Sequence, residues 1–376
     1  MMIYVHIPFC RSKCRYCAFN SIVGGAEIRA AYVDALIREI ALRGDKSAVE
    51  TIYFGGGTPT TLTLAQLEKI LGAVLKNFRV DNRAEVTIEA NPGTVDENYL
   101  RGLKMLGFNR ISLGVQSFDD ALLKILGRIH GSRSAVDTVA LAKKFFGNVS
   151  VDLMYGLPTQ TLEGVRRDVS RLGTLDVEHV SIYGLEVESG TKFFELARAG
   201  KLPLPDENTC ADMYDHITTT LPALGWRRYE ISNFARENFE SRHNRGYWTG
   251  KKYFGFGAGA HSFDGGLRTS NVGDVSKYIG GICAGESVSA VEEVVNRRAA
   301  MEEFCFLGLR VVEGISARTF EKIFGASIFD VFGAVIERNR RFGLLAVDGG
   351  KIFLTTRGMS LGNEVFADFL LEEATT

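Results

Sequence analysis

Short strand-like runs alternate with helical segments through the first half of the chain. The runs are rich in β-branched and aromatic residues and span residues 3–7, 51–54, 85–89, 110–114, 149–154 and 179–183. Each is followed by a segment in which apolar residues recur with helical spacing. Strands joined through helices pair in parallel with right-handed crossovers, so the pattern predicts an α/β fold. An open sheet and a barrel both satisfy it.

Helix boundaries also carry recognisable signals. Thr63 and Gln66 fit a capping box, and Thr94 and Glu97 repeat the same spacing. Gly107 follows the second of these helical segments and predicts that this helix ends at a glycine in the left-handed backbone conformation.

Polar or glycine-rich residues follow all six predicted strands. In both an open sheet and a barrel, ligands bind at these carboxyl ends of the strands. These loops span residues 8–17, 55–60, 89–93, 114–118, 152–158 and 183–186. Glycine and proline in any single loop are explained by turn formation alone. Six such loops at one edge favour an assembled site.

The pattern changes beyond about residue 206, and we expect three regions. Residues 1–205 form the predicted α/β part, residues 206–297 an aromatic, glycine-rich extension, and residues 298–376 a small α+β unit. The last unit combines helices with a predicted hairpin at residues 344–354, which is typical of winged-helix domains. It carries 9 basic and 11 acidic residues, so we expect protein contacts there rather than nucleic-acid binding.

The charge balance gives no reason to expect a nucleic acid or an anionic membrane as partner. The chain has 44 Lys and Arg against 45 Asp and Glu, for a net charge of −1. No apolar run approaches the roughly 18 residues that span a bilayer. The first residues lead into a strand-like run rather than a signal peptide. We therefore expect a cytoplasmic protein with reduced thiols.

Three of the six cysteines, Cys10, Cys14 and Cys17, lie within eight residues. A zinc ion would need a fourth ligand, for which His6 is a candidate. An iron–sulfur cluster can be held by three thiolates, which leaves one iron open. A structural role without metal is the third interpretation. The scattered cysteines are expected to be small buried hydrophobic residues: Cys210, Cys283 and Cys305.

The CxxxCxxC pattern of these cysteines, with Tyr16 before the last one, resembles the signature of radical S-adenosylmethionine (SAM) proteins. The whole chain resembles the oxygen-independent coproporphyrinogen III oxidase family, most of all its heme chaperone branch. This resemblance implies a partial (β/α)₆ barrel in which Cys10, Cys14 and Cys17 hold a [4Fe-4S] cluster. In such proteins SAM binds the open iron, and one electron cleaves it to methionine and a 5′-deoxyadenosyl radical.

The resemblance also implies a SAM pocket. Gly56, Gly57 and Thr58 belong to a motif whose backbone meets the amino group of SAM, where a missing Cβ permits close approach. Further cofactor-binding residues implied by the family are Tyr4, Tyr16, Glu89, Gln116, Arg128 and Asp152. Carboxylates suit ribose hydroxyls or an ammonium group, and an arginine suits a carboxylate.

Two departures separate the branches of this family. The oxidases have a fourth cysteine two positions after the third, where this chain has Phe19. They also carry an N-terminal extension over the active site, whereas the cluster motif here starts at residue 10. Both differences favour the heme chaperone branch.

The segment that runs from His243 through Tyr247 to Trp248 resembles the HNxxYW segment linked to heme binding in that branch. A histidine among aromatic rings suits the axial ligation of heme. In the alternative, His243 forms hydrogen bonds inside a packed core. His261 is the second candidate ligand. The remaining histidines outside the first strand are expected to be structural or on the surface: His130, His179 and His216.

We therefore expect a radical SAM-type heme chaperone that binds a [4Fe-4S] cluster, SAM and heme, and delivers heme to acceptor hemoproteins. Its further partners would be an electron donor and a second copy in a homodimer. An enzyme is the first alternative: oxygen-independent coproporphyrinogen III dehydrogenase, which decarboxylates two propionates. A zinc-stabilised adaptor that acts through its winged-helix-like unit is the second.

Overall fold

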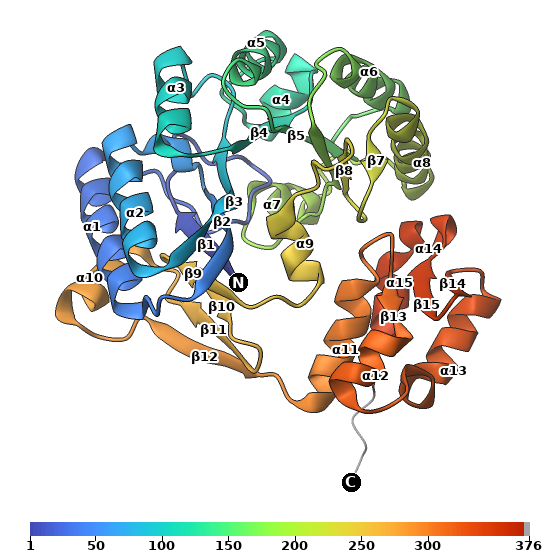
Figure 1. The fold of residues 1–376 in the computed structure, drawn as a ribbon. Coiled ribbons are helices and arrows are strands. Elements are labelled where there is room, and N and C mark those ends of the chain that lie inside the picture. The colour runs from blue at the N-terminus through green and yellow to red at the C-terminus, as the bar shows by residue number, and fades with distance from the viewer. Residues whose placement is uncertain (372–376) are drawn as a thin grey trace.

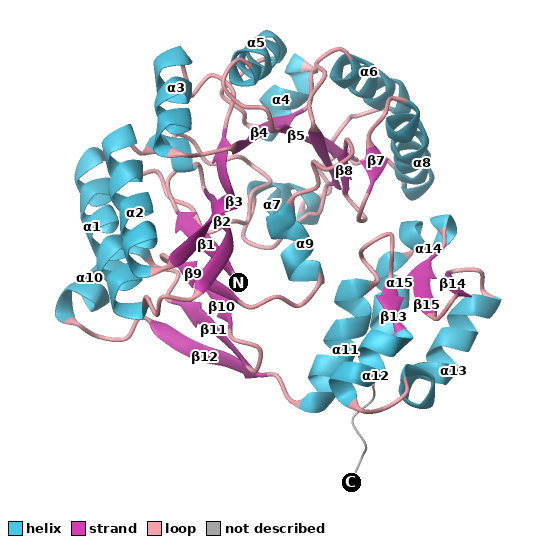
Figure 2. Cartoon of the chain, viewed as in Figure 1, coloured by secondary structure: helices cyan, strands magenta, loops and turns pink. Residues whose placement is uncertain are grey.

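Six parallel strands form the centre of a twelve-stranded sheet in the computed structural model (Figure 2), which describes residues 1–371. They are β1 (Met2–Ile7), β2 (Ala48–Gly56), β3 (Arg79–Ala90), β4 (Arg110–Gln116), β5 (Val149–Tyr155) and β6 (His179–Gly184). Their order in the sheet follows their order in the sequence, and each neighbouring pair is parallel. The predicted strands are therefore confirmed, with bounds that are longer at most ends.

Most of the helices that follow these strands cover one face of the sheet. The helices are α1 (Ala26–Arg43), α2 (Leu64–Asn77), α3 (Glu97–Leu106), α4 (Asp120–Leu126), α5 (Ser132–Lys143) and α6 (Leu162–Gly173), followed by α7 (Lys192–Arg198) and α8 (Glu207–Ala223). Of these, α4 and α7 instead pack against each other beside the cysteine loop, residues 8–17. Figure 1 shows α1, α2, α3, α5, α6 and α8 along an outer arc around the strands. Sequential parallel strands with helices on one face curl the sheet, which resolves the two sequence-based alternatives in favour of a partial barrel.

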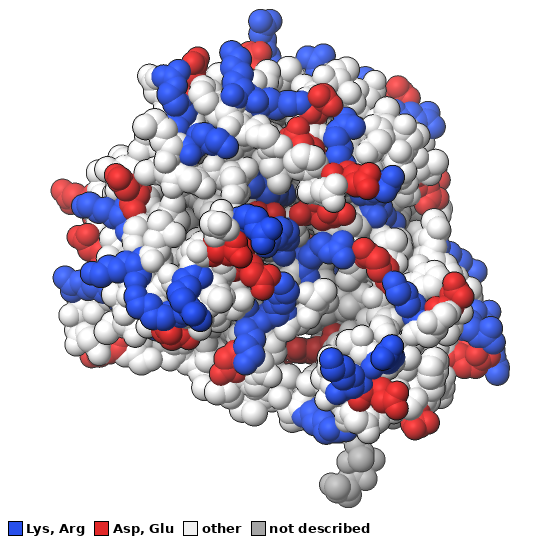
Figure 3. Space-filling view, viewed as in Figure 1, with Lys and Arg blue, Asp and Glu red and all other residues white. Residues whose placement is uncertain are grey.

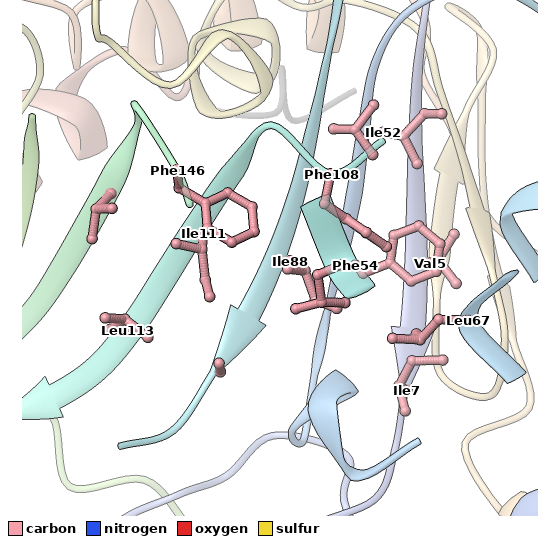
Figure 4. Close-up of a cluster of buried hydrophobic side chains, with 14 of the residues drawn as sticks. Val5, Ile7, Ile52, Phe54, Leu67, Ile88, Phe108, Ile111, Leu113 and Phe146 are labelled. Atoms are coloured by element: carbon pink, nitrogen blue, oxygen red, sulfur yellow. The ribbon is translucent and has the colours of Figure 1, made fainter. Parts of the chain in front are cut away.

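Successive residues of each strand face opposite sides of the sheet. The apolar residues face the helices and form the main core, in which Phe54 of β2 packs edge-on against Phe108 at 5.2 Å. Figure 4 shows this cluster, which includes Val5, Ile7, Ile52, Ile88, Ile111 and Leu113. The alternate residues, such as Tyr53, Glu89 and Asp152, face the barrel interior and are largely polar. The outer face of the barrel, under its helices, is therefore apolar, and its interior is polar.

The helix-boundary predictions have mixed outcomes. The capping box of α2 is present, with Gln66 donating its backbone amide to Thr63 Oγ1 at 3.3 Å. The same prediction for α3 is wrong, because Asp96 is its N-cap and accepts from the amide of Tyr99 at 2.8 Å. The Thr94 hydroxyl instead donates to the Asn91 carbonyl at 2.6 Å, which closes the preceding turn.

The chain beyond residue 206 extends both edges of the sheet. At one edge, β8 (Asn233–Ala235) pairs antiparallel with β6, and β7 (Arg227–Arg228) pairs antiparallel with β8. At the other edge, β9 (Tyr253–Phe256) pairs in parallel with β1. Three antiparallel strands continue that edge: β10 (His261–Phe263), β11 (Leu267–Asn271) and β12 (Ser289–Val294). Two short helices interrupt this region, α9 (Arg242–Trp248) and α10 (Val275–Ala284).

A separate hydrophobic core holds the last part of the described chain together. Its elements are α11 (Arg297–Gly308), β13 (Ile315–Ser316), α12 (Ala317–Phe324), α13 (Ile328–Arg341), β14 (Leu345–Asp348), β15 (Lys351–Leu354), α14 (Thr356–Ser360) and α15 (Gly362–Asp368). The predicted hairpin is present as β14 and β15, and β13 completes a three-stranded sheet. This order of helices and strands matches the winged-helix-like expectation.

The surface carries no large region of one charge on the face shown in Figure 3, where basic and acidic side chains are interspersed. No helix among residues 1–371 is both long and apolar enough to cross a bilayer.

Candidate cofactor site

The cysteine cluster lies in the loop that follows β1. Cys10, Cys14 and Cys17 are half-buried, free thiols, and the backbone amide of Cys17 donates to the Cys14 carbonyl at 3.3 Å. Burial raises the pKa of Cys10 and of Cys17, and the charge of Cys14 raises both further. A positively charged metal centre would reverse this effect by favouring the thiolates. Among residues 1–371, no three His, Cys, Asp or Glu side chains converge on the position of a single metal ion.

A chain of polar contacts links two of these cysteines across three loops. The Cys10 Sγ lies 3.7 Å from Thr58 Oγ1, which accepts a hydrogen bond from Asn91 Nδ2 at 2.8 Å. Arg128 donates to Asn91 Oδ1 and, at 3.5 Å, to the Sγ of Cys14. Cys14, Thr58, Asn91 and Arg128 line a small pocket beside the cysteine loop. Sequence reasoning missed Asn91 as a site residue, although it lies in one of the strand-end loops.

The glycine-rich segment at the end of β2 lies so close to neighbouring groups that a side chain would not fit there. Gly56 has a φ of +116°, and a Cβ there would meet the ring of His6 at 2.7 Å. A Cβ on Gly57 would lie 2.8 Å from the Phe9 carbonyl oxygen and 3.0 Å from Cys10 Sγ. The loop therefore forms a cradle against the first cysteine, and this fits a cofactor that approaches the backbone closely.

The predicted carboxylates Glu89 and Asp152 lie inside the barrel. Tyr53 donates to Glu89 Oε1 at 2.7 Å, and Ser112 donates to Asp152 Oδ1 at 3.0 Å. Burial raises the pKa of Glu89 to about 7, with a further rise from the charge of Asp152. Burial also raises the pKa of Asp152, against the opposing effect of its serine hydrogen bonds. Glu89 therefore carries a proton close to neutral pH and can exchange it with a bound ligand.

Tyr4 and His6 face the same interior from β1. The Tyr4 hydroxyl lies 3.0 Å from His6 Nδ1, and His6 Nε2 lies 2.8 Å from the carbonyl of Asn20. Burial lowers the pKa of His6. Both ring nitrogens are engaged, so His6 is not free to complete a zinc site with the cysteines.

Tyr16 lies within the cysteine loop, and Gln116 lies at the carboxyl end of β4. The ring of Tyr16 packs against Phe193 at 6.4 Å, and burial raises the pKa of its hydroxyl. Gln116 ends β4 with a φ of +71°, a left-handed conformation that is unusual for a residue with a side chain. Such strain is found at ligand-binding positions, where the surrounding structure enforces it.

His243 lies at the opposite end of the barrel, 1% exposed, on the N-terminal half of α9. Its Nδ1 lies 2.8 Å from Thr51 Oγ1 and its Nε2 lies 3.1 Å from the Tyr247 hydroxyl. Its ring stacks on Tyr53 at 5.1 Å. Burial lowers the pKa of His243 to about 3, and the nearby charge of Arg110 lowers it further. In this arrangement both ring nitrogens are occupied, as the packed-core alternative expects.

Arg110 is the interior residue that the sequence did not reveal. It starts β4, is 2% exposed, and its Nε has no hydrogen-bond partner among residues 1–371. Its charge lowers the pKa of His179 and of His243 and opposes the rise at Glu89. The period-two alternation of β4 could have placed it inside, because Ser112 and Arg110 share a face.

The remaining histidines and cysteines fall mostly outside the site. His179 is buried between Ser150 and the Tyr229 hydroxyl, each at 2.8 Å, whereas His261 is exposed and lies 2.8 Å from Glu292. The expected burial of the scattered cysteines is correct only for Cys305, because Cys210 is half-buried and Cys283 is exposed.

Comparisons with known proteins agree with this arrangement. Residues 4–172 match the radical SAM superfamily, and residues 295–361 match the HemN C-terminal domain. The solved structure of coproporphyrinogen III oxidase from Escherichia coli, described as a radical SAM enzyme, matches with a TM-score of 0.86 at 25% identity. That match covers 98% of this chain and 89% of the oxidase chain.

Curated relatives are similar along almost their whole length. The heme chaperone HemW of Bacillus subtilis is 40% identical, over 98% of this chain and 99% of its own. The heme chaperone HemW of Lactococcus lactis is 39% identical, over 98% of this chain and 97% of its own. The mitochondrial radical S-adenosyl methionine domain-containing protein 1 of Danio rerio is 33% identical, over 98% of this chain and 87% of its own. The chain therefore belongs to the HemW family of heme chaperones within the radical SAM superfamily.

Proposed function

We propose that this protein binds heme and delivers it to acceptor hemoproteins. The observation that carries the proposal is the near full-length similarity to curated heme chaperones, at 39–40% identity over 98% of the chain. The similarity reaches both the cysteine loop and the C-terminal unit, so it is not confined to the shared barrel. The corresponding identity to the coproporphyrinogen oxidase is 25%.

We further propose that Cys10, Cys14 and Cys17 hold a [4Fe-4S] cluster, with SAM in the adjoining pocket. The thiols lie in one loop, and each cysteine of such a cluster ligates its own iron, so they need not converge on one ion. The Gly57 backbone lies directly beside Cys10, and the Arg128 guanidinium suits a carboxylate. When bound and reduced, the cluster supplies one electron to the sulfonium of SAM. An outside electron donor is then a required partner.

For heme, we keep His243 as the proposed axial ligand, with His261 as the second candidate. His243 needs one of its two hydrogen bonds to open, either to Thr51 or to Tyr247, before a nitrogen can ligate iron. The aromatic residues Tyr53 and Tyr247 already surround the imidazole and suit contact with a macrocycle.

The second candidate function is coproporphyrinogen III dehydrogenase, favoured by the shared fold with the Escherichia coli oxidase. One set of measurements separates the two functions. Anaerobically reconstituted protein is titrated with heme, incubated with a heme-free acceptor hemoprotein, and separately supplied with coproporphyrinogen III, SAM and a reductant. We expect a stable heme complex, transfer to the acceptor and no protoporphyrinogen. Formation of protoporphyrinogen without heme transfer would overturn the chaperone proposal.

A further inference from the structure

The helix that carries His243 is fixed firmly at its N-terminal end. Glu85 of β3 accepts from the backbone amides of Arg242 at 3.1 Å and His243 at 3.0 Å. The N-cap Ser241 accepts from the amide of Asn244 at 3.3 Å. Hydrogen bonds to a carboxylate are among the stronger ones in proteins, so this end of α9 is well anchored to the barrel.

The C-terminal end of α9 is held by the C-terminal unit instead. Arg310, in the segment after α11, places its guanidinium carbon 4.4 Å from the centroid of the Trp248 ring. Trp248 Nε1 and Arg310 Nε are both buried, and neither has a hydrogen-bond partner among residues 1–371. Arg245 adds a partly exposed ion pair to Glu313 at 3.1 Å, an interaction that contributes little by itself. The cation–π contact is therefore the main contact from the C-terminal unit to this end of α9, while Tyr247 also packs edge-on against Tyr253 of β9, with ring centroids 4.9 Å apart.

The same C-terminal segment is attached to the barrel independently of α9. The amide of Val312 donates to the Tyr229 carbonyl at 3.0 Å, and Val311 forms a bridge with Glu230. Figure 1 shows α9 between the barrel and α11. Beyond α9, Gly250 has a φ of +64°, a position at which the chain can bend. The contacts thus place a stiff anchor at one end of the helix and a releasable contact followed by a glycine at the other.

We propose that Arg310 is a positioning residue that holds α9 closed over His243, so that this histidine becomes available to a ligand only when Trp248 is released. Opening at the Trp248 end displaces Tyr247 and frees Nε2, while the Thr51 contact at Nδ1 and the Glu85 anchor persist. The C-terminal unit then controls access to the segment that we propose for heme binding. Only this last step rests on the proposed function.

The closed state is tested first without heme, in the full-length reconstituted protein. Diethyl pyrocarbonate labels accessible imidazoles, and mass spectrometry reads the rate at His243. We expect Arg310→Ala to label about tenfold faster than the wild type, and Arg310→Lys to fall in between because the ammonium keeps part of the cation–π contact. Arg341→Ala is the matched control, since Arg341 lies in the same unit, is exposed and, within residues 1–371, forms an ion pair with Glu337 alone.

Tryptophan fluorescence gives a second readout. The chain has two tryptophans, and Trp226 is buried with its Nε1 donating to the Val177 carbonyl at 2.8 Å. In a Trp226→Phe background, Trp248 is the only emitter, and Arg310→Ala should shift its emission to longer wavelength. Unchanged labelling and emission in Arg310→Ala, with cluster content and circular dichroism equal to the wild type, would overturn the proposal.

Heme titration then separates this inference from the proposed function. Faster heme binding in Arg310→Ala, together with faster labelling, supports both. Faster labelling without any heme binding by wild type or variant keeps the positioning role and removes the heme function. Heme binding by Arg310→Ala at the wild-type rate, with His243 in the heme-free variant as protected from the reagent as in the wild type, contradicts the positioning role and leaves the chaperone function standing.

Discussion

Arg128 donates to the Sγ of Cys14 at 3.5 Å, and through Asn91 it is joined to Thr58, beside Cys10. One guanidinium therefore connects two of the three thiols. Its positive charge opposes the rise in the pKa of Cys10, and its side chain lines the pocket beside the cysteines. Arg128 is thus suited both to hold the loop and to bind an anionic group of a cofactor.

The first prediction follows from this double role. Arg128→Gln should weaken SAM binding about tenfold, because it removes a charge-assisted contact to a carboxylate. Iron and sulfide content should stay near the wild-type level, since all three cysteines remain. Equilibrium dialysis of SAM and iron analysis measure the two quantities. Arg133→Gln, at a side chain that is 94% exposed, is the matched control and should bind SAM normally.

The second prediction concerns the glycine cradle. Gly57→Ala should cost about 2 kcal/mol of stability and reduce cluster content, because its Cβ would press on the Phe9 carbonyl and on Cys10 Sγ. Gly72→Ala is the matched control, in the middle of α2 with no atom near the added Cβ. It should raise the stability by about 0.5 kcal/mol. Urea denaturation and iron analysis test both, and normal cluster content in Gly57→Ala would contradict the close approach.

The fold could be predicted from the sequence because its main signal is periodic. Alternating apolar residues in strands such as β1 and amphipathic spacing in helices such as α2 are local properties, and right-handed crossovers fix how they combine. The cysteine spacing is likewise local. Asn91 and Arg110 were missed because their roles depend on which loops and strand faces meet in space.

His243 is another residue whose surroundings could not be predicted from the sequence. Its sequence context carries the resemblance to a heme-linked segment, but it does not show whether the imidazole is open. That depends on Thr51, nearly two hundred residues earlier in the chain, and on Tyr247 one helical turn later. The capping error at α3 is a smaller case, because Asp96 and Thr94 compete for the same helix start and only the chain path decides between them.

The third prediction concerns pH and Glu89. In the folded protein burial raises its pKa to about 7, whereas its ordinary value is 4.5. The folded state therefore keeps the proton between these values, while the unfolded chain loses it. Protonation of the buried Glu89 contributes about 3 kcal/mol to the free energy of unfolding. This contribution is fully present below about pH 4.5 and is lost as the pH rises through 7.

Glu89→Gln removes this ionisation and retains an acceptor for Tyr53. We expect the variant to be more stable than the wild type at pH 8 and of similar stability at pH 4.5, as measured by urea denaturation of the cluster-free protein. Glu97→Gln is the control, because Glu97 is exposed and forms a surface ion pair with Arg101 on α3. A pH-independent difference between Glu89→Gln and the wild type would show that folding does not raise the pKa of Glu89.

The fourth prediction tests the second hydrophobic core. Phe320 is fully buried there and packs against Phe304 at 5.5 Å and Phe324 at 4.7 Å. Phe320→Ala should destabilise the C-terminal unit by about 4 kcal/mol, because the removed ring leaves a cavity among these residues.

Phe329→Ala, at a ring that is 45% exposed, is the control and should cost less than about 1 kcal/mol. Since the barrel has its own core, Phe320→Ala should make the C-terminal unit sensitive to protease while the barrel keeps its cluster. Loss of the unit also removes Arg310 from Trp248, so His243 should become accessible in the same variant. A single unfolding transition shared by both cores, shifted as a whole, would instead show that the barrel depends on this unit for its stability.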